Sequence, residues 1–235
     1  MDNCFHFKQF DLEFGKSSQK VTTDSVLLGA WTDASGNIRN ILDVGAGTGL
    51  LALMMAQRCP EAYIDAIEVD PFAVDESKAN FGHSKWRERL NVYEGDFSSF
   101  DFPKKYDLII SNPPYFSENT YSHNERRNVA RHETNLNIES LILKSRKLLT
   151  PDGSLAFVCP YRLDAKVLLA KELAGFTSAR EARVNTVEGK SPYLSLFQLS
   201  FTGNSKKEEI TIKDRENKYT EQYIGLTSDF YLFLH

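Results

Sequence analysis

Strand-like and helix-like segments alternate along most of this chain, from about residue 38 to residue 201. Apolar, β-branched runs predict buried strands at 38–44, 62–69, 90–93, 106–111 and 155–159. Segments with the composition or spacing of packed helices separate them, at 50–57, 71–81, 138–149 and 163–173. Such alternation predicts an α/β fold with a mostly parallel sheet and helices on both faces.

The second half of the chain departs from this alternation. Two successive strand-like runs, 177–187 and 193–201, are joined by a short polar segment and predict an antiparallel hairpin. Pro151-Asp152-Gly153 predicts a turn before the strand at 155. The polar residues 203–209 predict an exposed loop, and the aromatic-rich segment 219–233 predicts a tail that packs back on the domain.

Composition excludes several classes of protein. The formal net charge is −4, which argues against binding of nucleic acid through overall charge. The charge is uneven, because residues 121–235 hold 17 basic and 14 acidic side chains whereas residues 1–120 hold 11 and 18. A basic face on the second half is compatible with these numbers, although a mixed, solvated surface is their more usual meaning.

The cysteines and the apolar segments predict the compartment. Cys4, Cys59 and Cys159 form no disulfide framework and show no metal-ligand spacing, so we expect no metal and a reducing environment. Polar residues interrupt the N-terminal segment, so no signal peptide is expected. No segment approaches the roughly 18 apolar residues that span a bilayer. We therefore expect a cytoplasmic protein without a membrane partner.

A glycine loop follows the first predicted strand. Gly45-Ala46-Gly47-Thr48-Gly49 lies between a strand and a helix, where glycines permit tight turns and close approach of a ligand. Glu68 ends the next strand, where a carboxylate can accept both hydroxyls of a ribose. Asp96 is expected at an adenine amino group of a cofactor and Phe97 beside the adenine ring. The residues expected to bind this cofactor are Asp43, Gly45, Ala46, Gly47, Gly49, Glu68, Asp96 and Phe97.

The spacing of this loop distinguishes two cofactors. The NAD fingerprint is G-x-G-x-x-G, whereas this loop reads G-x-G-x-G. S-adenosylmethionine carries a sulfonium cation, which suits a pocket that holds Asp43, Glu68 and Asp96. Asp43 could orient the loop or hold the amino group of the methionine. A dehydrogenase remains a remote alternative.

A polar segment precedes the first predicted helix. Thr22 or Thr23 fits the N-cap of a helix over 25–31, and Asp24 would favour its dipole. An alternative is that Thr22, Thr23 and Asp24 cover the methionine end of the cofactor. Both interpretations stay open at the level of the sequence.

Asn112-Pro113-Pro114-Tyr115 directly follows the predicted strand at 106–111. Such a sequence suits the transfer of a methyl group to a planar amino nitrogen, whose lone pair is delocalised. The Asn112 side-chain oxygen and the Pro113 carbonyl can accept its two N–H bonds, and Pro114 stiffens the backbone. Tyr115 offers an aromatic face to a base. Catalysis would then depend on alignment and on preorganised dipoles, with Asn112 also next to the cofactor.

A long segment without apolar periodicity follows, from residue 116 to residue 137. The candidates for contacts with a base and with phosphates are Tyr115, Phe116, Arg126, Arg127 and Arg131. A solvated loop with internal ion pairs is the alternative. At the end of the following helix, Lys144, Arg146 and Lys147 suit the helix dipole.

Several motifs together resemble one family of enzymes. They are Phe7-Lys8-Gln9-Phe10, residues 20–31 (KVTTDSVLLGAW), the glycine loop, residues 111–116 (SNPPYF) and the ending 219–233. From about Phe5 to Phe233, the chain resembles the bacterial tRNA1(Val) (adenine(37)-N6)-methyltransferases. The NPPY element alone is also typical of rRNA, DNA and protein-glutamine methyltransferases, and the first segment and the aromatic tail narrow the group.

The resemblance implies a Rossmann-like class I methyltransferase fold, with a seven-stranded sheet and an antiparallel C-terminal hairpin. It implies a single domain over 1–235, in which 1–37 cover the cofactor, 38–202 form the catalytic core and 203–235 pack on it. Cofactor contacts would fall on Thr22, Asp43, Gly45, Gly47, Glu68 and Asp96, and catalytic groups on Asn112, Pro113 and Tyr115.

The implied activity is S-adenosylmethionine-dependent N6-methylation of adenine 37 in the anticodon stem-loop of valine tRNA, by an enzyme expected to be monomeric. Methylation of rRNA adenine is one alternative. Methylation of a protein glutamine is another, which is disfavoured because only about thirty-seven residues precede the first strand. A non-catalytic RNA-binding module is a third, against which the intact Asn112–Tyr115 motif argues.

Overall fold

A computed structural model describes residues 3–15, 21–114 and 136–233 of this chain. The helices are α1 (Thr23–Trp31), α2 (Leu50–Arg58), α3 (Pro71–His83), α5 (Ile138–Leu148), α6 (Asp164–Leu173) and α7 (Glu221–Thr227), with 3-10 turns at Arg87–Arg89 and Tyr161–Leu163. The strands are β1 (Cys4–His6), β2 (Asp11–Glu13), β3 (Asn40–Val44), β4 (Tyr63–Glu68), β5 (Leu90–Glu94), β6 (Tyr106–Ser111), β7 (Leu149–Pro160), β8 (Ser178–Val187), β9 (Leu194–Ser200) and β10 (Lys206–Lys213).

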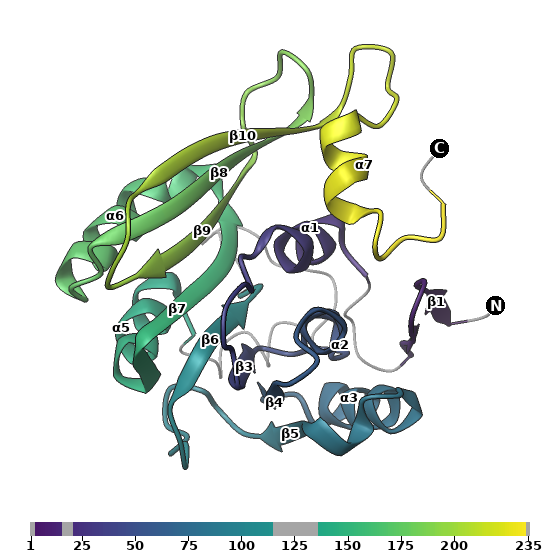
Figure 1. The fold of residues 1–235 in the computed structure, drawn as a ribbon, viewed down its shortest axis with the longest axis vertical. Coiled ribbons are helices and arrows are strands. Elements are labelled where there is room, and N and C mark those ends of the chain that lie inside the picture. The colour runs from purple at the N-terminus through teal and green to yellow at the C-terminus, as the bar shows by residue number, and fades with distance from the viewer. Residues whose placement is uncertain (1–2, 16–20, 115–135, 234–235) are drawn as a thin grey trace, which may run out of the picture.

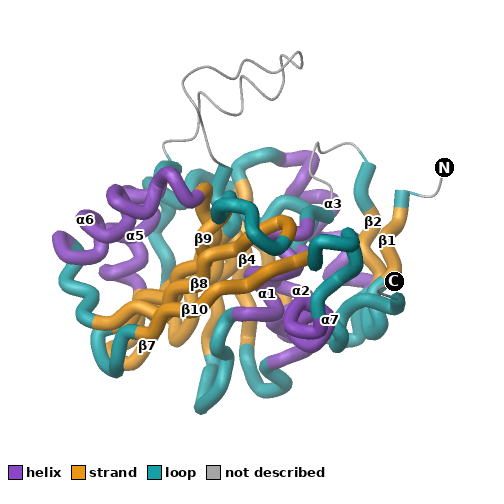
Figure 2. Tube along the Cα trace, turned by 90° about the horizontal axis from the view of Figure 1, so that it is seen from above, coloured by secondary structure: helices purple, strands orange, loops and turns teal. Residues whose placement is uncertain are grey.

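The central sheet runs in the order β10-β8-β9-β7-β6-β3-β4-β5 within the described residues. Strands β7, β6, β3, β4 and β5 are parallel, and β9 lies antiparallel to both β7 and β8. Helices α1, α2, α3 and α7 lie on one side of the sheet and α5 and α6 on the other (Figures 1 and 2). The predicted fold class and the antiparallel hairpin are confirmed.

Each face of the sheet has its own apolar core. On the side of α1 and α2, the core includes Leu28, Leu53 and Ile110, all fully buried. On the side of α5 and α6, it includes Leu141 and Phe157. Burial of both faces explains why the strands read as continuous apolar runs instead of alternating ones.

Two predictions about irregular segments are wrong. The predicted turn at Pro151-Asp152-Gly153 lies within β7, which runs past it with a break in register opposite Tyr106. A Cβ atom on Gly153 would lie 2.8 Å from the carbonyl oxygen of Tyr106, so the close approach of these strands requires glycine there.

The predicted exposed loop at 203–209 is the second, and it is wrong only for 206–209, since 203–205 lie outside any strand and are exposed. Its last residues begin β10, an eighth strand beyond the seven implied by the resemblance, which pairs in parallel with β8 along the sheet edge. Lys206, Lys207, Glu208 and Glu209 precede the alternating Ile210 and Ile212, so apolar periodicity marks only the end of this strand. Lysines and glutamates suit an edge strand, because they discourage pairing with other molecules.

The two ends of the chain lie against each other. Phe7 forms an antiparallel bridge with Tyr231, and the Lys8 backbone N–H donates to the Phe230 carbonyl at 2.8 Å. The phenyl rings of Phe7 and Phe10 stack with centroids 4.6 Å apart. Helix α7 packs on α1, as the aromatic tail predicts, and Figure 1 shows β1 on the same side as the chain after α7.

Candidate active site

Strand register brings the two main motifs together. Val44, the last residue of β3, pairs with Ser111, the last residue of β6, so that the glycine loop and Asn112 both begin one residue later. The Ser111 hydroxyl donates to the Val44 carbonyl at 2.8 Å and ties the two strand ends. Because β4 lies on the other side of β3, the strand order reverses here, which is where open α/β sheets bind ligands.

Three glycines give the loop its shape. Gly45, Gly47 and Gly49 have φ values of 72°, 56° and 84°, in the left-handed region that side chains with a Cβ rarely adopt. At Gly49 there is also no space, because a Cβ atom would lie 2.5 Å from Cε1 of Phe81. Gly49 is the N-cap of α2, so the loop leads directly into a helix whose first N–H groups face the site.

Side chains of helix α3 form hydrogen bonds with the backbone of the glycine loop. The Asn80 amide donates to the carbonyl oxygens of Thr48 and Glu13, both at 2.9 Å, and its oxygen accepts from the Glu13 N–H at 2.8 Å. The Ser77 hydroxyl donates to the Gly47 carbonyl at 2.7 Å. Asn80 is 2% exposed, so these bonds are shielded from water and fix the loop relative to α3 and β2.

Glu68 ends β4 and turns its carboxylate toward the loop. Oε2 accepts from the Gly47 N–H at 2.9 Å, and Oε1 accepts from the N–H groups of Val69 and Asp70 at 2.8 and 3.0 Å. Three backbone N–H groups therefore donate to this buried carboxylate and fix its position beside the loop. Its predicted role at ribose hydroxyls stays a prediction, compatible with the further lone pairs of a carboxylate.

Asp43 is fully buried beneath the loop. Its Oδ2 atom accepts from the Ala52 N–H at 3.0 Å, whereas Oδ1 has no hydrogen-bond partner among the described residues. Burial raises the pKa of Asp43 to about 7, the bond from Ala52 opposes this rise, and the negative charge of Glu68 adds to it. The predicted contact of Asp43 with the methionine amino group of a cofactor stays a prediction.

Asp96 and Phe97 follow β5 at the same edge of the sheet. Asp96 accepts from the Ser98 N–H at 2.9 Å and thereby holds a tight turn. Phe97 is buried beside Phe102, and the Lys144 ammonium lies 5.3 Å from its ring centroid. Both residues border the predicted adenine position, and their contacts with the cofactor stay predictions.

Helix α1 reaches the catalytic segment through its first turn. Thr22 is the N-cap, with its hydroxyl oxygen accepting from the Ser25 N–H at 3.2 Å, so the capping prediction is confirmed. The Asn112 amide donates to Ser25 Oγ at 2.7 Å, and Ser25 Oγ lies 3.0 Å from Thr22 Oγ1. Since the oxygen and nitrogen of an amide point apart, this bond sets the direction of the Asn112 oxygen.

Asp24 lies beside this network, within the first turn of α1 after Thr23. It accepts a hydrogen bond of 3.2 Å from the Tyr193 hydroxyl. Burial raises the pKa of Asp24, and the bond from Tyr193 opposes that rise. The segment 22–24 therefore combines a helix cap with an acidic group at the edge of the site.

The remaining predicted residues are only partly described. Pro113 is buried and Pro114 is exposed directly after Asn112. Tyr115, Phe116, Arg126, Arg127 and Arg131 lie outside the described residues.

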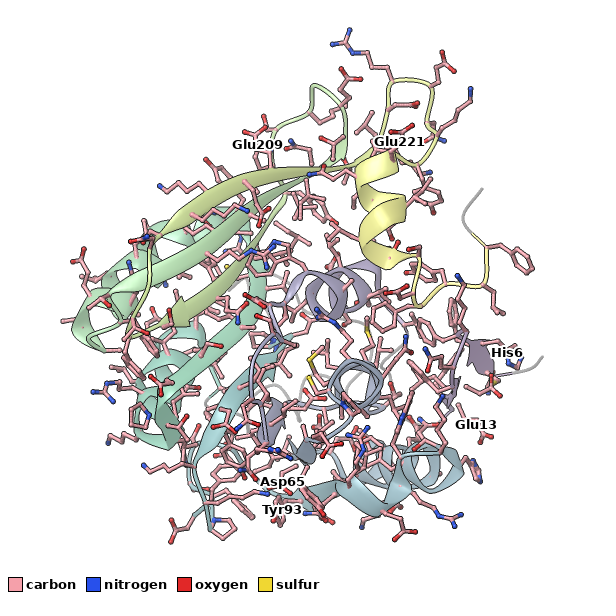
Figure 3. All side chains as sticks on the ribbon, viewed as in Figure 1. His6, Glu13, Asp65, Tyr93, Glu209 and Glu221 are labelled. Atoms are coloured by element: carbon pink, nitrogen blue, oxygen red, sulfur yellow. The ribbon has the colours of Figure 1, made fainter. Side chains whose placement is uncertain are left out.

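The N-terminal hairpin brings together side chains that are separate in the sequence. Ligand-type atoms of Cys4, His6 and Asp11 lie within 4.8 Å of one another, the one such group in the described residues. His6 and Asp11 are exposed, and His6 Nδ1 lies 2.7 Å from Asp11 Oδ1, as an ion pair or hydrogen bond requires. Figure 3 shows His6 on β1, at the edge of the molecule.

Comparisons with known proteins identify the family. The family model described as "Methyltransferase small domain" matches residues 17–187. The chain belongs to this methyltransferase family. It is therefore an S-adenosylmethionine-dependent enzyme, as predicted. Among the described residues, no helix is long and apolar enough to cross a membrane.

Similar proteins cover nearly the whole chain. A tRNA1(Val) (adenine(37)-N6)-methyltransferase of Aliivibrio fischeri is 41% identical over 99% of each chain. An enzyme with the same name from Tolumonas auensis is 40% identical over 98% of this chain and 97% of its own. Another, from Parabacteroides distasonis, is 38% identical over 97% of each chain. The resemblance predicted from the motifs is confirmed.

Solved structures support the fold. A predicted O-methyltransferase of Agrobacterium tumefaciens superposes with a TM-score of 0.71, at 16% identity over 91% of this chain and 99% of the other. A precorrin-6y C5,15-methyltransferase of Geobacter metallireducens gives 0.58, at 14% identity over 81% and 95%. At these identities the likeness concerns the fold alone.

Sequence reasoning missed the residues that hold the motifs in place. Ser25, Ser77, Asn80 and Ser111 each join two segments that are distant in the chain. Only Ser25 carried a local signal, since it lies three residues after the capping threonine.

Proposed function

We propose that this enzyme transfers a methyl group to N6 of adenine 37 in valine tRNA, within the cytoplasm. The observation that carries the proposal is the full-length similarity to enzymes of that name, with identities of 38 to 41%. The site supports it, because Asn112 follows the strand next to the glycine loop and its amide is held by Ser25. S-adenosylmethionine, when bound, supplies an electrophilic methyl group on its sulfonium.

The residues of this chain would act by orientation. The adenine amino nitrogen is a poor nucleophile, so acceptors at both of its N–H bonds favour a pyramidal nitrogen with an available lone pair. The Asn112 oxygen and the Pro113 carbonyl are the proposed acceptors. Pro113 is buried and Pro114 is exposed, and their rings restrict the backbone that carries the Pro113 carbonyl. The proton leaves to solvent after transfer. The base must leave its stack to reach the site, which is easier for an unpaired base of an anticodon loop than for a base in a duplex.

The first test is methyl transfer from labelled cofactor into tRNA from a strain that lacks the gene, followed by digestion to nucleosides. We expect label in N6-methyladenosine. Label in rRNA or in a protein glutamine, but not in tRNA, would replace the proposal with one of those activities. Binding of tRNA without transfer to any acceptor would indicate a non-catalytic RNA-binding protein.

Two variants test the assigned chemistry. Asn112→Ala should lower kcat by about 100-fold or more, as loss of one preorganised polar group does in other enzymes, with nearly unchanged cofactor affinity. Ser25→Ala should lower kcat by about fivefold, since one hydrogen bond contributes about 1 kcal/mol. The control Ser35→Ala changes an exposed serine after α1. Equal losses of cofactor binding and kcat in Asn112→Ala would contradict this division of roles.

A further inference from the structure

A groove lined by lysines lies between α5 and the segment that connects β5 to β6. Its volume is about 860 Å³. The basic residues lining it are Lys104, Lys105, Lys144 and Lys147, against one acidic residue, Asp101. The overall charge of the chain is negative, so four lysines at one groove are a local excess of positive charge.

Three of these ammonium groups have no carboxylate at salt-bridge distance among the described residues. Lys104 is the exception, because its Nζ lies 3.0 Å from Oδ2 of the buried Asp65 in β4. Figure 3 places Asp65 close to Tyr93, at the end of the sheet formed by β4 and β5. Elsewhere, Lys207, Lys218 and Arg215 each pair with a glutamate. The positive charge of the groove is therefore only partly compensated.

Contacts with a carboxylate or with backbone carbonyls define the positions of three of these ammonium groups, those of Lys104, Lys105 and Lys144. Lys144 donates to the carbonyl oxygens of Ser98 and Phe100 at 3.0 and 2.8 Å, which ties α5 to the β5–β6 connection. Lys105 donates to the Lys147 carbonyl at the end of α5. The ammonium of Lys147, an exposed residue, donates no hydrogen bond and forms no ion pair within the described part of the chain. Lys105 and Lys147 are consequently the groups best placed to bind an external anion.

The groove begins at the reactive edge of the sheet. Ser98 and Ser99, two of its lining residues, follow the predicted adenine acceptor Asp96 at the end of β5. Ser140 lies in the first turn of α5, where the helix dipole also favours an anion. The groove then follows α5, whose eleven residues span about 16 Å, toward Lys105 and Lys147.

We propose that this groove binds the phosphodiester backbone of the RNA substrate and directs it away from the reactive edge along α5. Lysine ammonium groups and serine hydroxyls are the groups that proteins use for phosphate contacts. The partly exposed apolar side chain of Leu143 lines the same groove and offers a surface to ribose. The inference depends on the proposed tRNA substrate and adds the surface on which that substrate lies.

The test uses charge reversal on the full-length enzyme. Lys105→Glu with Lys147→Glu should raise KM for tRNA at least tenfold, with kcat within about twofold and an unchanged Kd for S-adenosylmethionine. The slope of log affinity for tRNA against log salt concentration should fall by about 1 to 2, as expected for loss of one or two phosphate contacts. The matched control is Lys78→Glu with Lys206→Glu, which changes the net charge equally on exposed lysines outside the groove.

A second variant separates recognition from folding. Lys105→Gln with Lys147→Gln removes charge without placing glutamate near the end of α5, and should raise KM in the same direction by a smaller factor. Unchanged KM and salt slope in both groove variants, with wild-type enzyme active on tRNA, would overturn the groove assignment. Absence of tRNA methylation by the wild-type enzyme would instead overturn the proposed function, and direct tRNA binding by the same variants would still test the groove.

Discussion

Asn80 offers a sharp test of how the cofactor loop is held. Its amide donates to the carbonyl oxygens of Thr48 and Glu13 and accepts from the Glu13 N–H, in a position that is 2% exposed. Asn80→Asp keeps the shape of the side chain and loses both donors. The new carboxylate would face two carbonyl oxygens without a proton to share, so the variant tests hydrogen bonding apart from packing.

The expected magnitude follows from the number of bonds. Each net hydrogen bond contributes about 0.5 to 1.5 kcal/mol, so loss of three in Asn80→Ala should cost about 2 to 4 kcal/mol of unfolding free energy. For a chain of this size, 1 kcal/mol corresponds to about 2 to 4 °C in Tm, so we expect a decrease of about 4 to 16 °C. Asn80→Asp should destabilise at least as much, because it leaves a buried charge without a partner.

Thermal and urea unfolding of the apo enzyme measure this effect, and calorimetric titration measures cofactor affinity. The control Asn91→Ala removes an exposed asparagine with one bond of 3.3 Å to Asp65 and should cost less than about 1 kcal/mol. Affinity for S-adenosylmethionine should fall only in the Asn80 variants, since Thr48 belongs to the loop. A Tm of Asn80→Asp within 2 °C of wild type would show that shape, not hydrogen bonding, holds the loop.

Two further predictions concern the loop itself. Gly49→Ala should lower the free energy of unfolding by about 2 to 4 kcal/mol, because its backbone is left-handed and the new Cβ atom overlaps with Phe81. Gly45→Ala should lower it by only about 1 to 2 kcal/mol, because no atom lies within 4 Å of its Cβ position. Equal losses of the two variants in thermal unfolding would refute the overlap with Phe81. The raised pKa of Asp43 predicts that stability of the apo enzyme falls as pH rises toward about 7, by up to about 1.4 kcal/mol per pH unit. Asp43→Asn should remove this slope, and parallel pH profiles of Tm would contradict the assignment.

Most of the fold could be predicted from local patterns. The segments that form β3, β4 and β6 are mostly apolar because both sheet faces are covered, and this pattern is visible in the sequence before the partner strands are known. The two wrong predictions concern segments in which strand pairing outweighs the local conformational preference of the residues. Gly153 looks like part of a turn yet allows β7 to pass the Tyr106 carbonyl, and the polar start of β10 becomes a strand only because β8 offers an edge.

The candidate site divides in the same way. The glycines of the loop, Glu68 and Asn112 are recognisable because their chemistry depends on residue type at a strand end. Asn80 was not predictable, since an asparagine in a helix has no local feature that distinguishes a solvated side chain from one that joins α3 to Thr48 and Glu13. Of the groove lysines, Lys144 and Lys147 were interpreted only as partners of the helix dipole, and the sequence alone led to no interpretation of Lys104 and Lys105.

The sequence by itself determined the family, the order of strands and helices between about residues 38 and 201, and the two motifs proposed to bear the chemistry. Local composition and spacing carry these features, because they depend on neighbours within a few residues. The tertiary structure decided which atoms meet: the pairing of Val44 with Ser111, the bond from Asn112 to Ser25, and the gathering of lysines along α5. These contacts join segments up to 87 residues apart, and only the register of the sheet and the packing of its helices fix such distances.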